Sequence, residues 1–347
     1  MVLVVIHTLK CADEIARCST VHNLVSGPVE TFDDTGAPPA EPEPAHTAHI
    51  DKLRELLVNS KLPDGDKTRV EETVERHSEW VREMNSLEGD GDRLIAQLVD
   101  SVNRYKRYVE LNLIWDSPSD FLWRQRGQLK LDNSILEEFL PRLVTPRIIP
   151  ALDGLLYETG PRTAFAAAYF VTTLSNPAQG GGLLVRTKDQ DFTIGRSAYL
   201  QSSFSDTFPP DDSVRHKIFL AAAAAECKTN LDKTMFQGSV SDAHDLKIAI
   251  PGARYYLLCE WLDMTPISTL GTDIDEVIIL RGKRLASNVR TKYSSTAARA
   301  ADRDWYDHFL HEHPIRHDSI HRFVEHLRAL FVEADPDELD VLQRGYF

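Results

Sequence analysis

Several features that mark other classes of protein are scarce or missing in this 347-residue sequence. No apolar run approaches the ~20 residues of a membrane-spanning helix, and the apolar start at 1–6 has no basic lead-in typical of a secretory signal. Cysteine is scarce, and its spacing matches neither a metal site nor a redox pair: Cys11, Cys18, Cys227 and Cys259. We therefore expect reduced thiols, a cytoplasmic location and no membrane partner.

Three ligand-binding motifs are incomplete. Gly180–Gly182 is not followed by the Gly-Lys-Ser/Thr of a phosphate loop, and the turn at 89–92 lacks the full calcium-loop pattern. His317 and His321 have the i,i+4 spacing of a helical zinc pair, but Pro314 interrupts the histidine-rich run around them. We interpret these histidines as solvated helix surface, the glycines as a loop and the acidic turn as a plain turn.

The average charge argues against a nucleic-acid partner, because 53 acids against 39 bases give a net charge of −14. The distribution is uneven, however. The stretch between Glu276 and Asp302 contains no acid, and its bases are Arg281, Lys283, Arg284, Arg290, Lys292 and Arg299. Because phosphate contacts are made locally, such a stretch can bind DNA on an acidic protein. A solvated basic face is the alternative.

Patterning along the chain predicts five segments. They are an N-terminal segment (1–26), a flexible proline-rich acidic linker (27–46), a helical region (47–131), a core (132–300) and a helical tail (301–347). The core alternates β-rich runs with helical ones. We therefore expect an α/β fold in which a central mixed sheet is flanked by helices, with a helical N-terminal region before it.

The most informative motif is the tetrad Glu226-Cys227-Lys228-Thr229, which follows five alanines. Alanine favours a helix by propensity, but a strand buried on both faces has the same composition, and we predict a strand at 217–228. On a strand, Glu226 and Lys228 point to one face and Cys227 to the other. An acid and a lysine at the end of a buried strand suit metal-dependent phosphodiester hydrolysis. The acid and the Cys227 carbonyl oxygen would bind Mg²⁺, and Lys228 would orient or deprotonate the attacking water.

A second metal-binding acid is expected upstream of the tetrad. Pro210-Asp211-Asp212 has an attractive motif, but if Asp212 begins the strand that ends at Glu226, the two acids are tens of ångströms apart. Asp191 opens a predicted strand at 191–204, and antiparallel pairing with 217–228 would place it beside Glu226. We predict Asp191 as this acid, with Asp189 in reserve.

One further carboxylate is expected from a nearby helix. The helix after Asn133 carries Glu137 and Glu138, and these are our candidates for it. Two exposed helical glutamates without a role in the site are the simpler expectation for this pair.

Three segments carry a resemblance to a known family: AECKTNLDKTMFQ (225–237), DQDFTIG (189–195) and the block NRYKRYVELNLIWDSPSDFLWRQRGQLKLDNSILEEFLPRLV (103–144). They resemble type II restriction endonucleases of the PD-(D/E)XK superfamily and, more narrowly, the Bpu-ten-I family. The likeness spans roughly residues 47 to 290. It implies a PD-(D/E)XK core and Mg²⁺-dependent cleavage of double-stranded DNA at a short sequence, leaving 5′-phosphates.

The resemblance also implies a multimer, since cutting both strands usually needs two active centres. A homodimer and a heterodimer with a related subunit both stay open, as does a non-catalytic DNA-binding or single-strand-nicking subunit. The candidates for DNA contacts are polar and basic side chains on the acid-free stretch and on the helix after the tetrad. They are Arg281, Lys283, Arg284, Asn288, Arg290, Lys292 and Gln237.

Overall fold

A computed structural model describes residues 47–285, 287–331 and 342, apart from the side chains of Ser287, Asn288 and Arg290. The expected N-terminal segment at 1–26 and the linker at 27–46 lie outside the described residues, as does most of the chain after 331. The described residues all belong to one compact unit. Within them, no helix combines the length and the apolar character needed to cross a membrane.

A helical region comes first in the described chain, as the sequence predicts. Its helices are α1 (Ala48–Val58), α2 (Asp64–Ser86), α3 (Gly91–Tyr108), α4 (Phe121–Gln128) and α5 (Ser134–Phe139), and the π-helical η2 (Val109–Trp115) continues α3. On α3, Leu94, Leu98 and Val102 recur at helical spacing and are buried. This apolar stripe is what packs α3 against its neighbours. Short 3-10 helices lie at η3 (Leu140–Leu143), η4 (Pro150–Leu152), η5 (Gln179–Gly182) and η6 (Pro210–Asp212).

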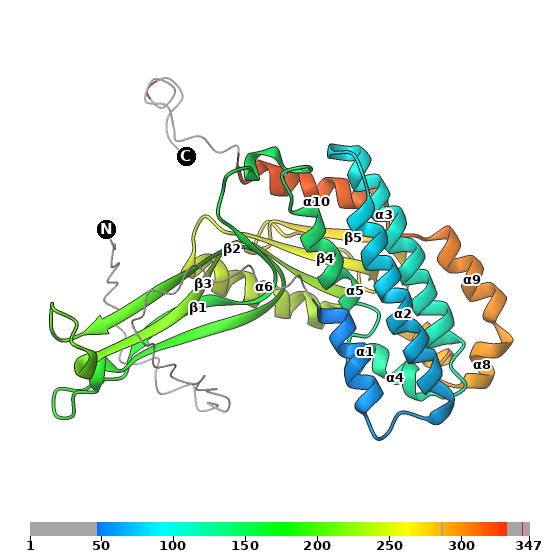
Figure 1. Ribbon diagram of the computed structural model, residues 1–347, viewed down its shortest axis with the longest axis horizontal. Helices are drawn as coiled ribbons and strands as arrows, with labels where there is room; N and C mark the ends of the chain where they lie inside the picture. The colour runs from blue at the N-terminus through cyan, green and yellow to red at the C-terminus, as the bar shows by residue number, and fades with distance from the viewer. Residues whose placement is uncertain (1–46, 286, 332–341, 343–347) are drawn as a thin grey trace. The chain divides into compact units, whose positions relative to one another are not determined.

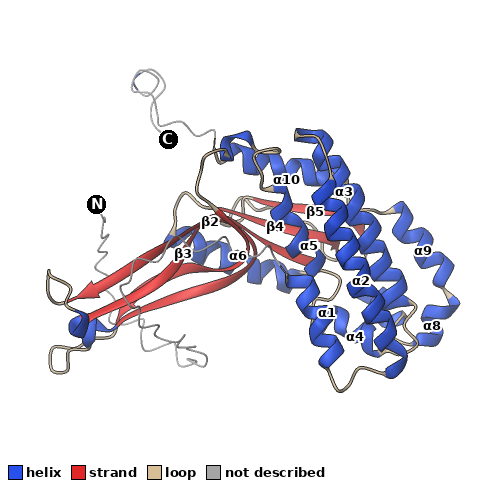
Figure 2. Ribbon diagram, viewed as in Figure 1, coloured by secondary structure: helices blue, strands red, loops and turns tan. Residues whose placement is uncertain are grey.

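One five-stranded mixed sheet forms the centre of the fold (Figure 2). Its strands are β1 (Glu158–Phe170), β2 (Leu183–Ser203), β3 (Ser213–Leu231), β4 (Arg254–Leu262) and β5 (Glu276–Arg284), in that spatial order. β1, β2 and β3 are antiparallel neighbours, whereas β3, β4 and β5 run parallel. The helix α6 (Lys233–Ala249) makes the crossover that the parallel pair β3–β4 requires. The expected α/β class is therefore confirmed.

β2 folds back on itself instead of running straight. Its first part pairs with β1 and its last part with β3. In a straight strand, residues 183 and 200 would be about 55 Å apart. Leu200 pairs with His216 of β3, and the His216 side chain donates a hydrogen bond to the Leu183 carbonyl oxygen. The two ends of β2 therefore lie close together. The pairing of β2 with β3 shifts register between Ile194 and Gly195, and a Cβ atom at Gly195 would come within 2.1 Å of the Leu220 carbonyl oxygen. The pairing of β2 with β3 begins at Phe192, so Asp191 is the residue just before it.

Two clusters of buried apolar side chains cover the sheet, one on each face. On β3, Ala223, Ala225 and Cys227 face the layer that contains α1, α2, α3, α5 and α10 (His317–Ala329). Ala224 lies between them and faces the other layer, with Phe236 and Leu246 of α6. Burial on both faces explains why this alanine-rich run forms a strand. The remaining helices are α7 (Ser287–Lys292), α8 (Thr296–Ala301) and α9 (Arg303–Glu312).

The outer parts of β1, β2 and β3, with the loops 171–182 and 204–212, extend beyond the helices on the left of Figure 1. We call this part the arm. The strands expected separately at 182–186 and 191–204 are the two parts of the single strand β2. The segment boundaries proposed from the sequence stay predictions.

Candidate active site

The candidate site lies where β2 and β3 diverge. Phe192 and Ala225 are the last residues that pair between the two strands, and beyond this point β3 pairs with β4 alone. The backbone groups of Cys227 are thereby left facing the gap. Its N–H donates to Asp191 Oδ2 at 2.8 Å, and its carbonyl oxygen accepts from Asn133 Nδ2 at 2.8 Å. Asp191 thus reaches the tetrad from the neighbouring strand.

Glu226 and Lys228 lie together on the α6 side of β3, and their charged groups form an ion pair. Glu226 also accepts hydrogen bonds through Oε2, from the Ser239 hydroxyl on α6 and from the Tyr255 hydroxyl on β4, the latter at 3.3 Å. Burial, together with the charge of Glu226, raises the pKa of Tyr255, so this hydroxyl stays a donor. Packed elements therefore hold the Glu226 carboxylate in one orientation.

The other wall of the gap comes from the start of α5. Lys130 donates to Asp191 Oδ1 at 2.8 Å, and its Nζ lies 4.0 Å from Glu137 Oε1. Glu137 is buried, and its Oε1 has no hydrogen-bond partner. Burial and the nearby charge of Asp191 raise the pKa of the Glu137 carboxyl. Neither Lys130 nor Asn133 was among the site residues predicted from the sequence, although both lie in the 103–144 block.

The expectation of two exposed glutamates on α5 is wrong, because Glu137 and Glu138 are 6% and 4% exposed. Glu138 faces away from the site. Its Oε1 accepts from the backbone N–H groups of His49 and Ile50, at 2.7 and 2.9 Å, and its Oε2 bonds His77 Nε2 at 2.6 Å. Glu138 therefore caps the start of α1, where unpaired N–H groups favour an anion. Glu137 alone faces Asp191.

A pocket of about 240 Å³ opens beside the gap. Its lining includes Lys130, Asn133, Lys228, Arg126 and Trp123. The pocket therefore presents basic and amide groups next to the tetrad. Because Lys130 and Lys228 both line it, a phosphate group entering here would meet two ammonium groups.

The oxygen atoms around the gap fit a small divalent cation. Among the described residues, no three His, Cys, Asp or Glu side chains are clustered to hold a metal by themselves. Mg²⁺ needs fewer protein ligands, because it usually keeps several waters and binds through one or two carboxylates. Asp191, Glu226 and the Cys227 carbonyl oxygen are the candidates for such a set. Glu137 Oε1, which accepts no hydrogen bond, is a candidate for a further oxygen. All of these donor atoms are oxygens, which are the ligands that hard cations such as Mg²⁺ bind.

Comparison with known proteins identifies the family. A model of the Bpu10I restriction endonuclease matches residues 128–347, which is more than half of the chain and includes the whole of the gap between β2 and β3. The chain belongs to the Bpu10I (Bpu-ten-I) restriction endonuclease family. It is therefore a site-specific endonuclease, and both the predicted family and the predicted enzyme class are confirmed.

The fold of this Bpu10I-family chain also has a counterpart among solved structures. It is similar to a chain of the native BbvCI A2B2 tetramer, solved at low resolution, with a TM-score of 0.54 and 17% sequence identity. The alignment covers 83% of this chain and 98% of the other. At this identity, the likeness bears on the fold. A search of curated proteins found no match.

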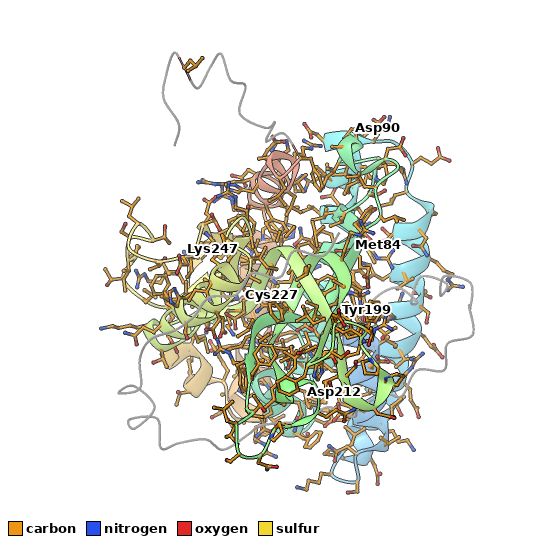
Figure 3. All side chains as sticks on the ribbon, turned by 90° about the vertical axis from the view of Figure 1, so that its left-hand side faces the viewer. Met84, Asp90, Tyr199, Asp212, Cys227 and Lys247 are labelled. Atoms are coloured by element: carbon orange, nitrogen blue, oxygen red, sulfur yellow. The ribbon has the colours of Figure 1, made fainter. Side chains whose placement is uncertain are left out.

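The other acids weighed from the sequence lie apart from the tetrad. Asp189 accepts from the Thr163 hydroxyl at 2.6 Å and is exposed. Asp212 lies at the outer end of the arm, where its carboxylate accepts from Ser203 Oγ at 3.0 Å and from the Phe204 N–H at 3.1 Å. Figure 3 labels Asp212 and Cys227 at their separate positions. Asp212 and Glu226 are fourteen positions apart, which corresponds to about 45 Å of extended chain.

Arg281 is buried, although the sequence suggested a DNA contact. Its guanidinium bonds Glu260 Oε2 at 2.9 Å, Glu110 Oε2 at 2.8 Å and the His313 carbonyl oxygen at 2.9 Å. The side chain of Lys106, also buried, lies 2.9 Å from Glu260 Oε1. Each of the three guanidinium nitrogens of Arg281 donates one of these hydrogen bonds. This favours a structural role over a DNA contact.

The remaining candidates for DNA contacts differ in what the structure describes. Lys283, Arg284, Lys292 and Gln237 are exposed. Arg284 donates to the Met264 carbonyl oxygen at 2.9 Å, and Lys292 pairs with Asp302 at 2.6 Å. The side chains of Asn288 and Arg290 lie outside the described residues.

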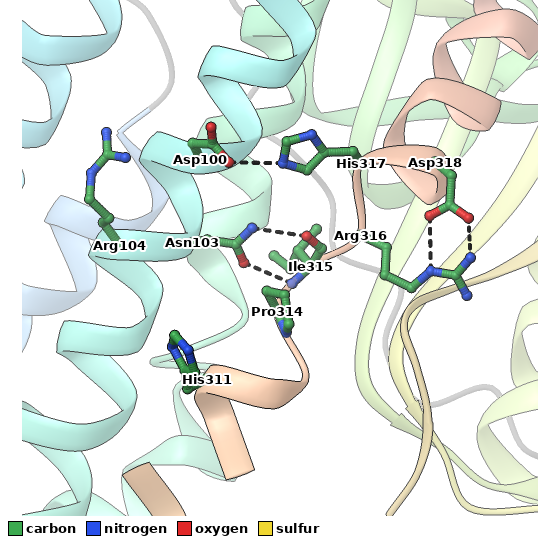
Figure 4. Close-up of a pocket in the computed structure, with 9 residues that line it drawn as sticks. All are labelled: Asp100, Asn103, Arg104, His311, Pro314, Ile315, Arg316, His317 and Asp318. Carbon is green, nitrogen blue, oxygen red and sulfur yellow. Dashed lines mark hydrogen bonds and ion pairs between the residues drawn. The ribbon is translucent and has the colours of Figure 1, made fainter. Parts of the chain in front are cut away.

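The histidine-rich region forms a shallow groove of about 660 Å³ between α3 and the start of α10 (Figure 4). In the groove, His317 Nε2 bonds Asp100 Oδ1 at 2.8 Å. Outside its lining, His321 Nε2 lies 3.2 Å from Asp92 Oδ1. Each histidine therefore pairs with a separate acid of α3. These half-exposed pairs fit the expected solvated surface better than a shared metal site.

Proposed function

We propose that this family member is a type II restriction endonuclease that hydrolyses double-stranded DNA with Mg²⁺ and leaves 5′-phosphates. The observation that carries the proposal is the meeting of Asp191 with the Glu226–Thr229 tetrad where β2 and β3 diverge. A carboxylate from each strand, with a lysine beside them, gives what metal-assisted phosphodiester hydrolysis needs.

Each residue has a role that its contacts support. Asp191, Glu226 and the Cys227 carbonyl oxygen would hold Mg²⁺, and Glu137 would add a further oxygen. A bound Mg²⁺ would supply a Lewis acid for water and for the scissile phosphate. Lys228 orients or deprotonates the attacking water and stabilises the negative charge that develops on the phosphate. Asn133 fixes the Cys227 carbonyl oxygen through its hydrogen bond of 2.8 Å.

Double-stranded DNA would be held by exposed cations outside the pocket. Lys283, Arg284 and Lys292 remain candidates, since all three are exposed and come from one stretch of the chain without acids. Gln237 on α6 is a further candidate. We expect most of these side chains to bind phosphates rather than to read bases.

The active form is proposed to contain more than one subunit. The BbvCI chain of similar fold comes from an A2B2 tetramer, which supports either a homodimer or an assembly with a related partner subunit. The second candidate function is a subunit that nicks one strand or only binds DNA. It is favoured by the two kinds of subunit in the A2B2 tetramer of BbvCI. An intact set of Asp191, Glu226 and Lys228 favours a catalytic subunit over a binding one.

The proposal is tested by incubating the full chain with a large, sequence-diverse DNA and Mg²⁺. Wild type should yield discrete fragments, or nicked circles if a partner is needed to cut the second strand. Lys228→Ala should cut about 100–1,000-fold more slowly, in line with the loss of one charge-stabilising group. Asp191→Asn should be inactive.

The matched control is Asp212→Asn, which makes the same chemical change at the outer end of the arm. It should cut like wild type. If Asp212→Asn is inactive and Asp191→Asn cuts normally, the metal-binding acid has been assigned to the wrong position. DNA that is retarded on a gel but never cut with Mg²⁺ or Mn²⁺ would favour the binding-subunit alternative.

A further inference from the structure

Lys130 has a backbone conformation that is unusual for its residue type. Its φ angle is 51°, in the left-handed region that residues other than glycine, asparagine and aspartate seldom adopt. The Lys130 carbonyl oxygen accepts from the N–H groups of Asn133 and Ser134, at 3.1 and 2.9 Å. The start of α5 therefore holds the strained residue in place. Such strain tends to occur at functional sites.

The Lys130 ammonium lies between acids proposed to bind the metal. It bonds Asp191 Oδ1 at 2.8 Å and lies 4.0 Å from Glu137 Oε1. The second oxygen of Asp191 is taken by the Cys227 N–H at 2.8 Å. Both Asp191 oxygens are thus occupied, and one of the two partners is a cation. A divalent ion that binds Asp191 through Oδ1 has to replace the Lys130 ammonium, because two cations cannot share that oxygen closely.

The neighbouring pocket can accept the displaced Lys130 ammonium. The Lys130 side chain is 44% exposed, whereas those of Asp191 and Glu137 are 14% and 8% exposed. Lys130 also lines the pocket of about 240 Å³ that it shares with Lys228 and Asn133. A half-exposed lysine can rotate about its side-chain bonds, and a phosphate in the pocket would offer it a new charge-assisted hydrogen bond.

We propose that Lys130 occupies the cation position on Asp191 in the free enzyme and moves to a DNA phosphate in the pocket, so that DNA entry clears the site for Mg²⁺. This inference rests on the function proposed above. It adds a phosphate-binding residue to Asp191, Glu226 and Lys228. No covalent bond changes in the exchange, since one ion pair replaces another.

The exchange couples two binding events. DNA that draws Lys130 away raises the affinity for the metal, and by thermodynamic reciprocity the metal raises the affinity for DNA by the same factor. The free enzyme would then bind Mg²⁺ weakly. A metal-loaded but DNA-free active site would be rare.

The test measures metal binding to the full chain without DNA, by calorimetric titration with Mg²⁺ and, separately, with Ca²⁺. Lys130→Met removes the ammonium but keeps most of the side-chain length. We expect this variant to bind the metal about tenfold more tightly than wild type, within the range usual for coupled sites. Lys130→Arg, which keeps the charge, should restore weak binding.

Lys52→Met is the matched control. It makes the same change in net charge, and Lys52 Nζ lies 3.6 Å from Glu137 Oε1, yet the Lys130 ammonium is the one on Asp191. Lys52→Met should therefore tighten metal binding clearly less than Lys130→Met. Equal tightening by both variants would mean that net charge alone sets the affinity, and would overturn the proposal. Thermal melts identify any variant whose fold has changed.

A second titration measures DNA binding with and without Ca²⁺, and the factor by which Ca²⁺ tightens it should shrink in Lys130→Met. An unchanged factor would overturn the proposed coupling. Asp191→Asn separates this result from the function itself. If Asp191→Asn weakens metal binding but Lys130→Met leaves it unchanged, only the role of Lys130 fails. If Asp191→Asn binds metal like wild type, the proposed hydrolytic site fails.

Discussion

Replacing Arg281 by methionine distinguishes a buried structural cation from a DNA contact. Methionine fills much of the same volume without a charge. The change leaves Glu110 and Glu260 without the guanidinium that bonds them at 2.8 and 2.9 Å, and it also removes the donor to the His313 carbonyl oxygen. Lys106 is then the nearest cation to Glu260. The Lys106 ammonium would then be left to neutralise both buried carboxylates, Glu110 and Glu260.

The expected cost follows from this imbalance. Breaking a buried ion pair by removing one partner destabilises a protein by about 3–5 kcal/mol. For a domain of this size, about 2–4 °C of melting temperature corresponds to each kcal/mol, so the midpoint should fall by roughly 6–20 °C. Burial raises the pKa of Glu260 despite Lys106 and Arg281 beside it. The Glu260 carboxyl can therefore take up a proton, and the loss should be smaller at pH 5.5 than at pH 7.5.

The assay is urea denaturation and calorimetry of wild type and Arg281→Met, with Arg284→Met as the control. Arg284 lies on the same strand but is exposed, so its replacement should change the free energy of unfolding by less than about 0.5 kcal/mol. The reasoning is refuted if Arg281→Met unfolds within about 1 kcal/mol of wild type. A stable Arg281→Met that loses DNA binding would make Arg281 a DNA contact after all.

Three further predictions follow from single positions. Gly195→Ala should strongly destabilise the fold, because its Cβ would lie 2.1 Å from the Leu220 carbonyl oxygen; a melting temperature within 2 °C of wild type would contradict the close approach. Burial, with the charge of His77, lowers the pKa of His49, so the unfolded state takes up this proton first as the pH falls below about 6.5. The free energy of unfolding should then decrease by up to about 1.4 kcal/mol per pH unit, and a His49→Gln variant should show a shallower slope in urea titrations; equal slopes would count against it. Lys283→Gln should weaken DNA binding and reduce the salt dependence of the affinity by about one unit of slope, whereas an unchanged slope would place Lys283 away from DNA.

The sequence predicted the elements around the tetrad well because local pattern and tertiary burial agree there. The alanine run before Glu226 could be assigned to a strand from its abrupt end in two charged residues, and layers on both faces confirm the reason. The antiparallel pairing that brings Asp191 to the tetrad followed from the positions of the strands in the chain. The role of Asp191 in metal binding stays a prediction.

Other features depended on contacts that no local pattern reveals. The strand β2, which folds back on itself, joins two runs that look like separate strands. Arg281 resembles its exposed neighbours in sequence, but it is a buried cation whose acceptors, on Glu110, Glu260 and His313, are all remote along the chain. In sequence, Glu138 has the pattern of an exposed helical residue, but its carboxylate is buried against the start of α1, where it accepts from the His49 N–H. In each case, the deciding partner is remote along the chain.

The central claim is that a divalent cation binds where β2 and β3 diverge. Crystals of the full chain grown with saturating Mn²⁺, measured at the manganese absorption edge, test it most directly. An anomalous peak should lie within about 2.0–2.4 Å of oxygens from Asp191 and Glu226, with the Cys227 carbonyl oxygen as a further ligand. Manganese bound elsewhere, for example beside His317 in the groove, with no peak at the tetrad would contradict the account.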